Sequence, residues 1–253
     1  CAILCPSMFR LLLALLVAAC SGASAAPVQV AVAANMAAPM QEIAARFQAA
    51  TGHQAIVALG STGKLYAQVR HGAPFQVLVA ADQETPERLE REGLAVPGSR
   101  FTYATGQIAL WSADAQAVDA QGAVLAQPPR GKLAAADPRV APYGAPAVAT
   151  LERLGVLAAW QPHLVQGESV GQAYQFAATG NARLGFVALS QVMASGRIPR
   201  GSAWIVPPHL HAPLKQDALL LAPGADAPAA KALMDYLRSD AGRAVLRGYG
   251  YTS

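Results

Sequence analysis

Short apolar segments alternating with helical patterns are the feature that most limits how this chain can fold. Residues 28–33 form an apolar run that predicts a strand, and the helical spacing that follows ends at Thr51-Gly52. Two more apolar runs, at residues 55–59 and 77–79, flank a second helical pattern. Strands that alternate with helices at this interval imply an α/β fold, in which helices cover both faces of a parallel sheet.

The rest of the chain continues in the same style, without an internal repeat or a low-complexity linker. Further strands are predicted at residues 107–111, 133–136, 184–187 and 215–221, and further helices at 86–92, 145–154, 170–178 and, as a closing pair, 227–246. A length of 253 residues suits either one large domain or two lobes of roughly 100 residues each.

The N-terminus carries a pattern typical of a secretory signal peptide. Arg10 precedes the apolar run Leu11 to Ala19, which is too short to span a bilayer as a helix. We expect residues 1–25 to be the signal, with cleavage after Ala23-Ser24-Ala25. The alternative is a lipoprotein-like box in which Cys20 is lipidated. Met8 fits the start of such a signal better than Cys1, so residues 1–7 are expected to precede the true start.

Composition limits the remaining chemistry. The chain is 53% hydrophobic and 13% charged, which predicts a packed globule rather than disorder. Its three cysteines (Cys1, Cys5 and Cys20) lie in or before the signal. Ordinary cleavage would therefore leave a mature chain without cysteine, which excludes disulfides and thiolate metal sites. The formal net charge is +4, but Lys and Arg are scattered, without a basic run. We therefore expect no nucleic-acid partner.

Polar side chains stand at two of the strand-to-helix junctions. Asn35 follows the first predicted strand, and Ser61-Thr62 follow the second, each directly before a helix. A helix start offers unpaired N–H groups, and a nearby hydroxyl or amide adds a further donor. The same residue types are also preferred helix caps, and one residue can both cap and bind a ligand. The junctions predict a cradle for a small anion.

Five stretches in this order and spacing resemble the periplasmic molybdate-binding proteins of ABC importers. They are Ala31 to Met36, Gly60 to Leu65, Gly72 to Asp82, Ala136 to Gly144 and Leu184 to Val187. Together they extend over most of residues 28–252, and the closing Tyr249-Gly250-Tyr251 is similar as well.

The resemblance implies the type II periplasmic binding fold. Such a protein has two α/β lobes, each a mostly parallel sheet flanked by helices, and binds its ligand in the cleft between them. The expected first lobe comprises residues 26–105 plus 217–253, and the second comprises residues 106–216. Hinge closure around the ligand is the expected motion.

The resemblance also implies the ligand and its contacts. Molybdate, and with it tungstate, is expected to meet Asn35, Ser61, Thr62, the hydroxyl of Tyr143 and the backbone N–H of Val170. No cofactor is implied, and no metal apart from the molybdate oxyanion. The implied partner is the membrane permease of an ABC importer. The binding protein itself is expected to be a monomer in the periplasm.

The chain departs from the common family pattern at two positions. Ala188 stands where many members have a Tyr shortly after the Leu-Gly-Phe-Val strand, and Asn35 stands where a Ser is common. We interpret Tyr143 as the replacement for the missing phenol, which places this chain in a variant subgroup.

Other functions are less well supported by the sequence. Within the same fold, the ligand could be another oxyanion such as sulfate or phosphate, or iron; the tandem tyrosines typical of iron binding are missing. An effector-sensing domain of a transcription regulator would share the architecture, but the chain shows no helix-turn-helix. No motif of a catalytic serine or metalloprotease occurs, so an enzyme is not expected.

Three further residues or pairs have structural interpretations. Lys64 follows a Gly-Ser-Thr-Gly turn whose glycines are too close together for a phosphate-binding P-loop. His209 and His211 form a weak candidate metal pair without a neighbouring carboxylate or Cys, which favours an exposed loop. Asp82 is expected to cap the following turn.

Overall fold

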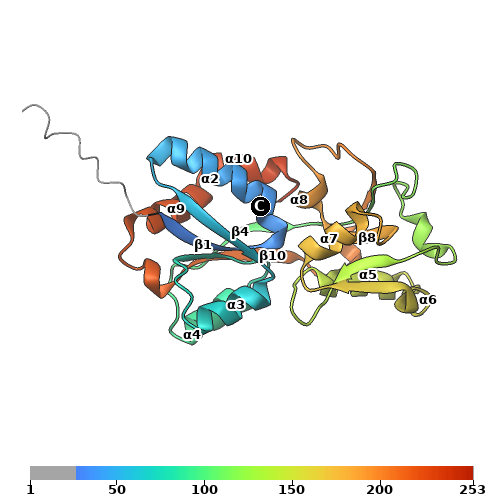
Figure 1. The fold of residues 1–253 in the computed structure, drawn as a ribbon, viewed down its shortest axis with the longest axis horizontal. Coiled ribbons are helices and arrows are strands. Elements are labelled where there is room, and N and C mark those ends of the chain that lie inside the picture. The colour runs from blue at the N-terminus through green and yellow to red at the C-terminus, as the bar shows by residue number, and fades with distance from the viewer. Residues whose placement is uncertain (1–26, 253) are drawn as a thin grey trace, which may run out of the picture.

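The computed structural model describes residues 27–252. Their strands form two separate five-stranded sheets, with strand orders β2-β1-β3-β10-β4 and β7-β6-β8-β5-β9. In Figure 1 the two sheets occupy the two halves of an elongated molecule. We call the half with β1 the first lobe and the half with β5 the second lobe.

The first lobe begins with the predicted βαβ units. Strands β1 (Val28–Ala33), β2 (Ala55–Gly60) and β3 (Val77–Val79) pair in parallel, with β1 in the middle. Alternate residues of β1 face opposite sides of the sheet. One face carries Val28, Val30 and Val32, which join the core under α2 (Ala37–Thr51), α9 (Pro228–Arg238) and α10 (Asp240–Gly248). The other face carries Ala31, which joins the core under α3 (Thr62–Arg70) and α4 (Glu84–Arg91).

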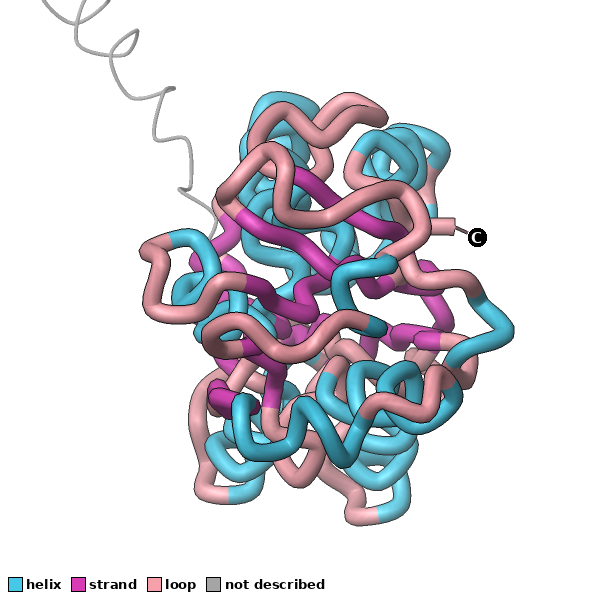
Figure 2. Tube along the Cα trace, turned by 90° about the vertical axis from the view of Figure 1, so that its right-hand side faces the viewer, coloured by secondary structure: helices cyan, strands magenta, loops and turns pink. Residues whose placement is uncertain are grey.

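The second lobe is built around five buried residues of β5 (Ile108–Ser112) and the four of β6 (Leu133–Ala136). β6 pairs in parallel with β7 (Leu164–Gly167) and β8 (Leu184–Ala188), and β5 pairs antiparallel with β8 and with β9 (Ser202–Ile205). The short α8 (Leu189–Val192) and α7 (Val170–Ala178) contact this sheet, as does α5 (Gly144–Arg153), which also packs on α6 (Leu157–Trp160). Figure 2, seen from this lobe, shows helices around the outside of the strands.

Both sheets are mostly parallel, as expected, and each contains one strand that runs against the other four. In the first lobe, β10 (Leu214–Leu220) lies antiparallel between β3 and β4 (Phe101–Gly106). The chain leaves the first lobe at the end of β4 and returns along β10, so the outgoing and returning strands run in opposite directions. Strands β4, β7 and β9 were not predicted, because each is short or carries polar residues on one face.

The two crossings between the lobes lie side by side. Leu214 pairs with Gly106 at the start of β10 and the end of β4. β5 begins at Ile108, and the return follows β9, which ends at Ile205. The expected return at residue 217 therefore falls inside β10. The C-terminus joins the same place, because Thr252 forms an isolated antiparallel bridge with Thr105.

The predicted signal peptide, residues 1–25, and its alternative lipidation site at Cys20 lie outside the described residues. Among residues 27–252, the helices are all too short or too polar to cross a membrane.

Candidate functional site

A small cavity lies between the two lobes. It is lined by Ala33, Ala34, Asn35, Ser61, Thr62 and Ala81 from the first lobe and by Ala141, Pro142, Tyr143, Ser169 and Val170 from the second. The structure thus brings together all five residues predicted to contact the ligand. The lining contains no Asp, Glu, Lys, Arg or His.

Each group of lining residues stands at the beginning of a helix. A 3-10 turn over Ala34–Met36 leads into α2, Ser61 caps α3, Tyr143 precedes α5, and Ser169 caps α7. The first N–H groups of a helix lack acceptors within the helix, and the helix dipole makes this end partially positive. Four such ends around one cavity create a favourable environment for an anion.

The hydroxyls of α3 both accept backbone hydrogen bonds. Ser61 Oγ accepts from the N–H of Lys64 at 3.4 Å, which is the capping interaction expected for this residue type. Thr62 Oγ1 accepts from the N–H of Ala81 at 3.1 Å and so ties the start of α3 to the end of β3. Neither hydroxyl donates to another described residue, so each proton is free to point into the cavity.

The start of α7 repeats this arrangement from the other lobe. Ser169 Oγ accepts from the N–H of Gln172 at 3.1 Å. Val170 is the first residue of α7; its side chain is buried in the core of the second lobe, and its N–H lies at the open helix end. Val170 was among the residues predicted to contact the ligand, and Ser169 was not. A Ser directly before a predicted helix is nevertheless the usual signal of a cap.

Tyr143 is 2% exposed, and its hydroxyl accepts from Gln216 Nε2 at 3.0 Å. The phenol donates to no other described residue, so its proton too is available to the cavity. Burial, with a smaller contribution from the neighbouring Tyr251, raises the pKa of Tyr143 well above its ordinary value. The hydroxyl therefore stays protonated over the physiological pH range.

Asn35 is oriented differently from the expectation that its side chain donates to the ligand. Its Nδ2 donates to Gln216 Oε1 at 2.9 Å and to the Tyr251 hydroxyl at 2.7 Å, which uses both amide hydrogens. Its buried Oδ1 has no partner among the described residues. The free donor of Asn35 is therefore its backbone N–H at the start of the helix.

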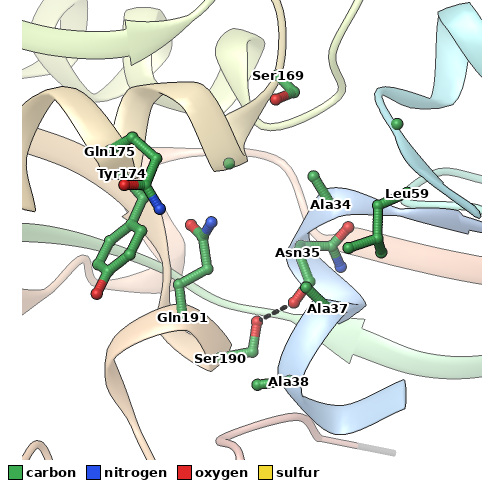
Figure 3. Close-up of a pocket in the computed structure, with 12 residues that line it drawn as sticks. Ala34, Asn35, Ala37, Ala38, Leu59, Ser169, Tyr174, Gln175, Ser190 and Gln191 are labelled. Atoms are coloured by element: carbon green, nitrogen blue, oxygen red, sulfur yellow. Dashed lines mark hydrogen bonds between the residues drawn. The ribbon is translucent and has the colours of Figure 1, made fainter. Parts of the chain in front are cut away.

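A wider groove adjoins the cavity on the outside of the molecule (Figure 3). It shares Ala34, Asn35 and Ser169 with the cavity. At its base the Ser190 hydroxyl donates to the Asn35 carbonyl oxygen at 2.7 Å, which joins α8 of the second lobe to the first lobe.

The lobes also touch beyond the cavity, at the start of α3. The N–H of Gly63 donates to the Val140 carbonyl oxygen at 3.3 Å. Next to it, Lys64 forms an exposed ion pair with Glu168 of the second lobe. The structure is therefore a closed form, in which the lobes meet around the cavity. This ion pair was not predicted from the sequence.

The remaining candidates lie elsewhere. Asp82 accepts from the N–H of Thr85 at 2.9 Å and caps the turn after β3, as predicted. Ala188 is fully buried at the end of β8 and is not among the residues that line the cavity. His211 is mostly buried and bonds to the Ala212 carbonyl. The described residues contain no group of three His, Cys, Asp or Glu arranged to hold a metal ion.

The chain is similar to known proteins along most of its length. The family described as bacterial extracellular solute-binding protein matches residues 28–252. The molybdate-binding protein ModA of Azotobacter vinelandii is 54% identical over 229 residues, which cover 90% of this chain and 91% of that protein. ModA of Rhodobacter capsulatus is 48% identical over 241 residues, or 95% of this chain and 94% of that protein.

A solved structure shows the same fold. The periplasmic molybdate-binding protein of Azotobacter vinelandii superimposes with a TM-score of 0.85 and 38% identity, covering 89% of this chain and 99% of that one.

Proposed function

The chain belongs to the bacterial extracellular solute-binding proteins, and we propose that within this family it captures molybdate and delivers it to an ABC importer. Its nearly full-length likeness to the two ModA proteins supports this function. We further propose that it works in the periplasm as a monomer, that it binds tungstate as well, and that it has neither an enzymatic activity nor a nucleic-acid partner.

One observation in the site supports the ligand class. Each of the four hydroxyls around the cavity has its oxygen occupied by a protein N–H: Ser61 by Lys64, Thr62 by Ala81, Tyr143 by Gln216 and Ser169 by Gln172. A hydroxyl whose lone pair is engaged in this way turns its proton toward the ligand. The site therefore offers donors to an oxyanion and needs no formal counter-charge.

The number of donors accounts for tight binding. We assign to the ligand the four hydroxyls and the backbone N–H groups of Asn35 and Val170. A hydrogen bond to a charged partner contributes about 1.5–3 kcal/mol, so six of them contribute about 9–18 kcal/mol. The upper part of this range covers the roughly 10–12 kcal/mol of submicromolar to nanomolar binding together with the costs of association.

The donor set also separates the candidate oxyanions. Phosphate keeps a proton near neutral pH and gains from an acceptor in its site, whereas molybdate, tungstate and sulfate carry none. Among those three, size decides, because molybdate and tungstate are larger than sulfate and nearly equal to each other. Iron is disfavoured, because the cavity lining offers one tyrosine and no carboxylate.

Calorimetric titration of the mature, ligand-free protein with molybdate, tungstate, sulfate and phosphate tests this function. We expect similar affinities for molybdate and tungstate, at least about a hundredfold weaker binding of sulfate, or about 2.7 kcal/mol, and no binding of phosphate. Sulfate affinity equal to that of molybdate would refute the assignment.

A further inference from the structure

A buried polar cluster lies directly under the cavity, where the chain crosses between the lobes. It consists of Asn35, Tyr103, Tyr143, Gln216 and Tyr251, all at most 5% exposed. Tyr103 is on β4 and Gln216 is on β10, the two strands that connect the lobes. Gln216 is completely buried and bonds to three of the other four members.

Asn35 fixes the orientation of the Gln216 carboxamide. The carboxamide Oε1 accepts from Asn35 Nδ2 at 2.9 Å. The Tyr103 hydroxyl lies 2.7 Å from the same Oε1 and 2.9 Å from the Ala80 carbonyl oxygen, so its one proton is shared between two acceptors. Burial keeps Tyr103 protonated, since it raises the pKa of this phenol well above its ordinary value. Turning the carboxamide over would set Nε2 against Asn35 Nδ2 and would lose the hydrogen bond between them. Unpaired polar groups are costly in such a buried place. Gln216 Nε2 is therefore directed at Tyr143.

The backbone makes room for the contact between Gln216 and Tyr143. A Cβ on Gly106 would lie 2.3 Å from Gln216 Nε2 and 2.3 Å from the Tyr143 hydroxyl. Gly106 ends β4, at the crossing into the second lobe. Its missing side chain allows a glutamine of one lobe to meet a tyrosine of the other.

We propose that Gln216 is a positioning residue for oxyanion binding and acts through Tyr143. By donating to the phenol oxygen, Gln216 occupies its acceptor side and keeps its proton directed at the ligand. Without this donor the phenol can rotate and present a lone pair to the anion, which is repulsive. This proposal rests on the proposed function and deepens it, since it names a residue outside the cavity lining that sets the donor character of a residue inside it.

A double-mutant cycle measured by calorimetry with molybdate tests the proposal. Gln216→Met removes the amide at nearly constant length, and Tyr143→Phe removes the hydroxyl that it orients. We expect Gln216→Met alone to weaken binding roughly tenfold, and the same change in the Tyr143→Phe protein to have little further effect. Equal weakening in both backgrounds would mean that Gln216 only supports the fold, and unchanged affinity in folded Gln216→Met would overturn the proposal outright.

A second variant reaches the same contact if Gln216→Met does not fold. In Gly106→Ala, the new Cβ would clash with Gln216 Nε2 and with the Tyr143 hydroxyl and so separate the two side chains. The matched control is Gly248→Ala, because a Cβ there meets nothing within 4 Å. We expect weaker molybdate binding in the first and unchanged binding in the second. Wild-type affinity in Gly106→Ala would contradict the proposal.

The cycle separates this proposal from the proposed function. If the wild-type protein does not bind molybdate, the function itself fails. If the wild type binds and the two substitutions act independently, only the role of Gln216 fails.

Discussion

At the scale of single residues, the hydroxyls of the cavity are prepared before a ligand arrives. Ser61, Thr62, Tyr143 and Ser169 each accept one protein N–H. Little reorientation is then needed on binding, which limits the entropic cost. Loss of a single donor should be felt directly, because a dianion removed from water depends on every hydrogen bond it receives.

Tyr143→Phe tests one of these donors. The substitution keeps the ring and removes the hydroxyl, so molybdate affinity should fall by roughly 10-fold to 150-fold, corresponding to about 1.5–3 kcal/mol. Titration calorimetry measures the loss, and thermal unfolding without ligand should change little. Unchanged affinity would move the role of donor from this phenol to neighbouring backbone amides.

Asn35→Asp tests the electrostatic character of the site. A carboxylate oxygen would replace Nδ2, 2.9 Å from Gln216 Oε1, and would place a negative charge beside the anion. We expect molybdate affinity at neutral pH to fall by at least about a hundredfold, because a buried charge without a partner is very unfavourable. Affinity should rise again as the pH is lowered and the carboxyl takes up a proton. Binding that is weak but independent of pH would contradict this explanation.

Much of the site could be predicted at this scale, but not its supporting contacts. Ser61-Thr62 and Asn35 stand at strand-to-helix junctions that are visible in the sequence. Gln216 lies within a strand, and no local pattern shows that it meets Asn35 across 181 positions. The orientation of the Asn35 amide follows from that same contact, so the sequence could not reveal it either.

At the scale of elements, the starts of α3 and α7 approach from opposite lobes. Gly63 in the first turn of α3 faces Val140, and a Cβ on Gly63 would lie 2.9 Å from the Val140 carbonyl oxygen. Because real Cβ atoms are hardly ever that close to backbone oxygen, a side chain here would have to separate the lobes. The glycine therefore permits full closure.

Gly63→Ala should affect the closure of the lobes and the stability of the helix in opposite directions. Alanine favours a helix by roughly 0.5–1 kcal/mol over glycine, so thermal stability without ligand should be equal or higher. Molybdate affinity should nevertheless fall, by about tenfold, because the closed form is strained. Gly248→Ala is the control, since it also lies in a helix but has open space around it. Equal affinities of the two variants would show that the contact with Val140 does not matter.

The elements themselves were largely predictable where the chain alternates apolar strands and helices. β1, β2, β3, β5, β6 and β8 lie at or within one residue of their expected positions. The direction of β10 was not accessible to a local pattern, because an extended segment of this length fits a parallel or an antiparallel strand equally well. Its pairing with β4 depends on how the whole chain returns from the second lobe.

At the scale of the whole molecule, three tyrosines are buried in the polar cluster under the cavity, and the cost of ionising them should lower the free energy of unfolding at high pH. Burial raises the pKa of Tyr251 to about 12, and it also raises the pKa of Tyr103 and of Tyr143 well above its ordinary value. An unfolded tyrosine has a pKa near 10. The stabilisation from the neutral phenols is thus complete below about pH 10 and is lost as the pH rises through the folded-state values.

Chemical denaturation between pH 8 and pH 12 measures this loss. Tyr251 alone should cost about 1 kcal/mol at pH 11, with larger losses above that pH. Tyr251→Phe should flatten this part of the profile, whatever its effect on stability at pH 8. A profile with the same slope in both proteins would exclude Tyr251 as the cause.

The adjacent crossings of β4 and β10 have a mechanical consequence. Because both connections and the bridge between Thr105 and Thr252 lie together, we expect them to act as a hinge, a pivot about which the two lobes rotate like arms. The polar cluster lies close to this pivot, since a Cβ on Gly106 would meet both Gln216 and Tyr143. Displacement grows with distance from a pivot, so an ion slightly too large for the cavity should open a much wider gap at the outer ends of the arms. We expect a small difference in ionic radius thereby to become a difference in outline for a membrane partner to sense.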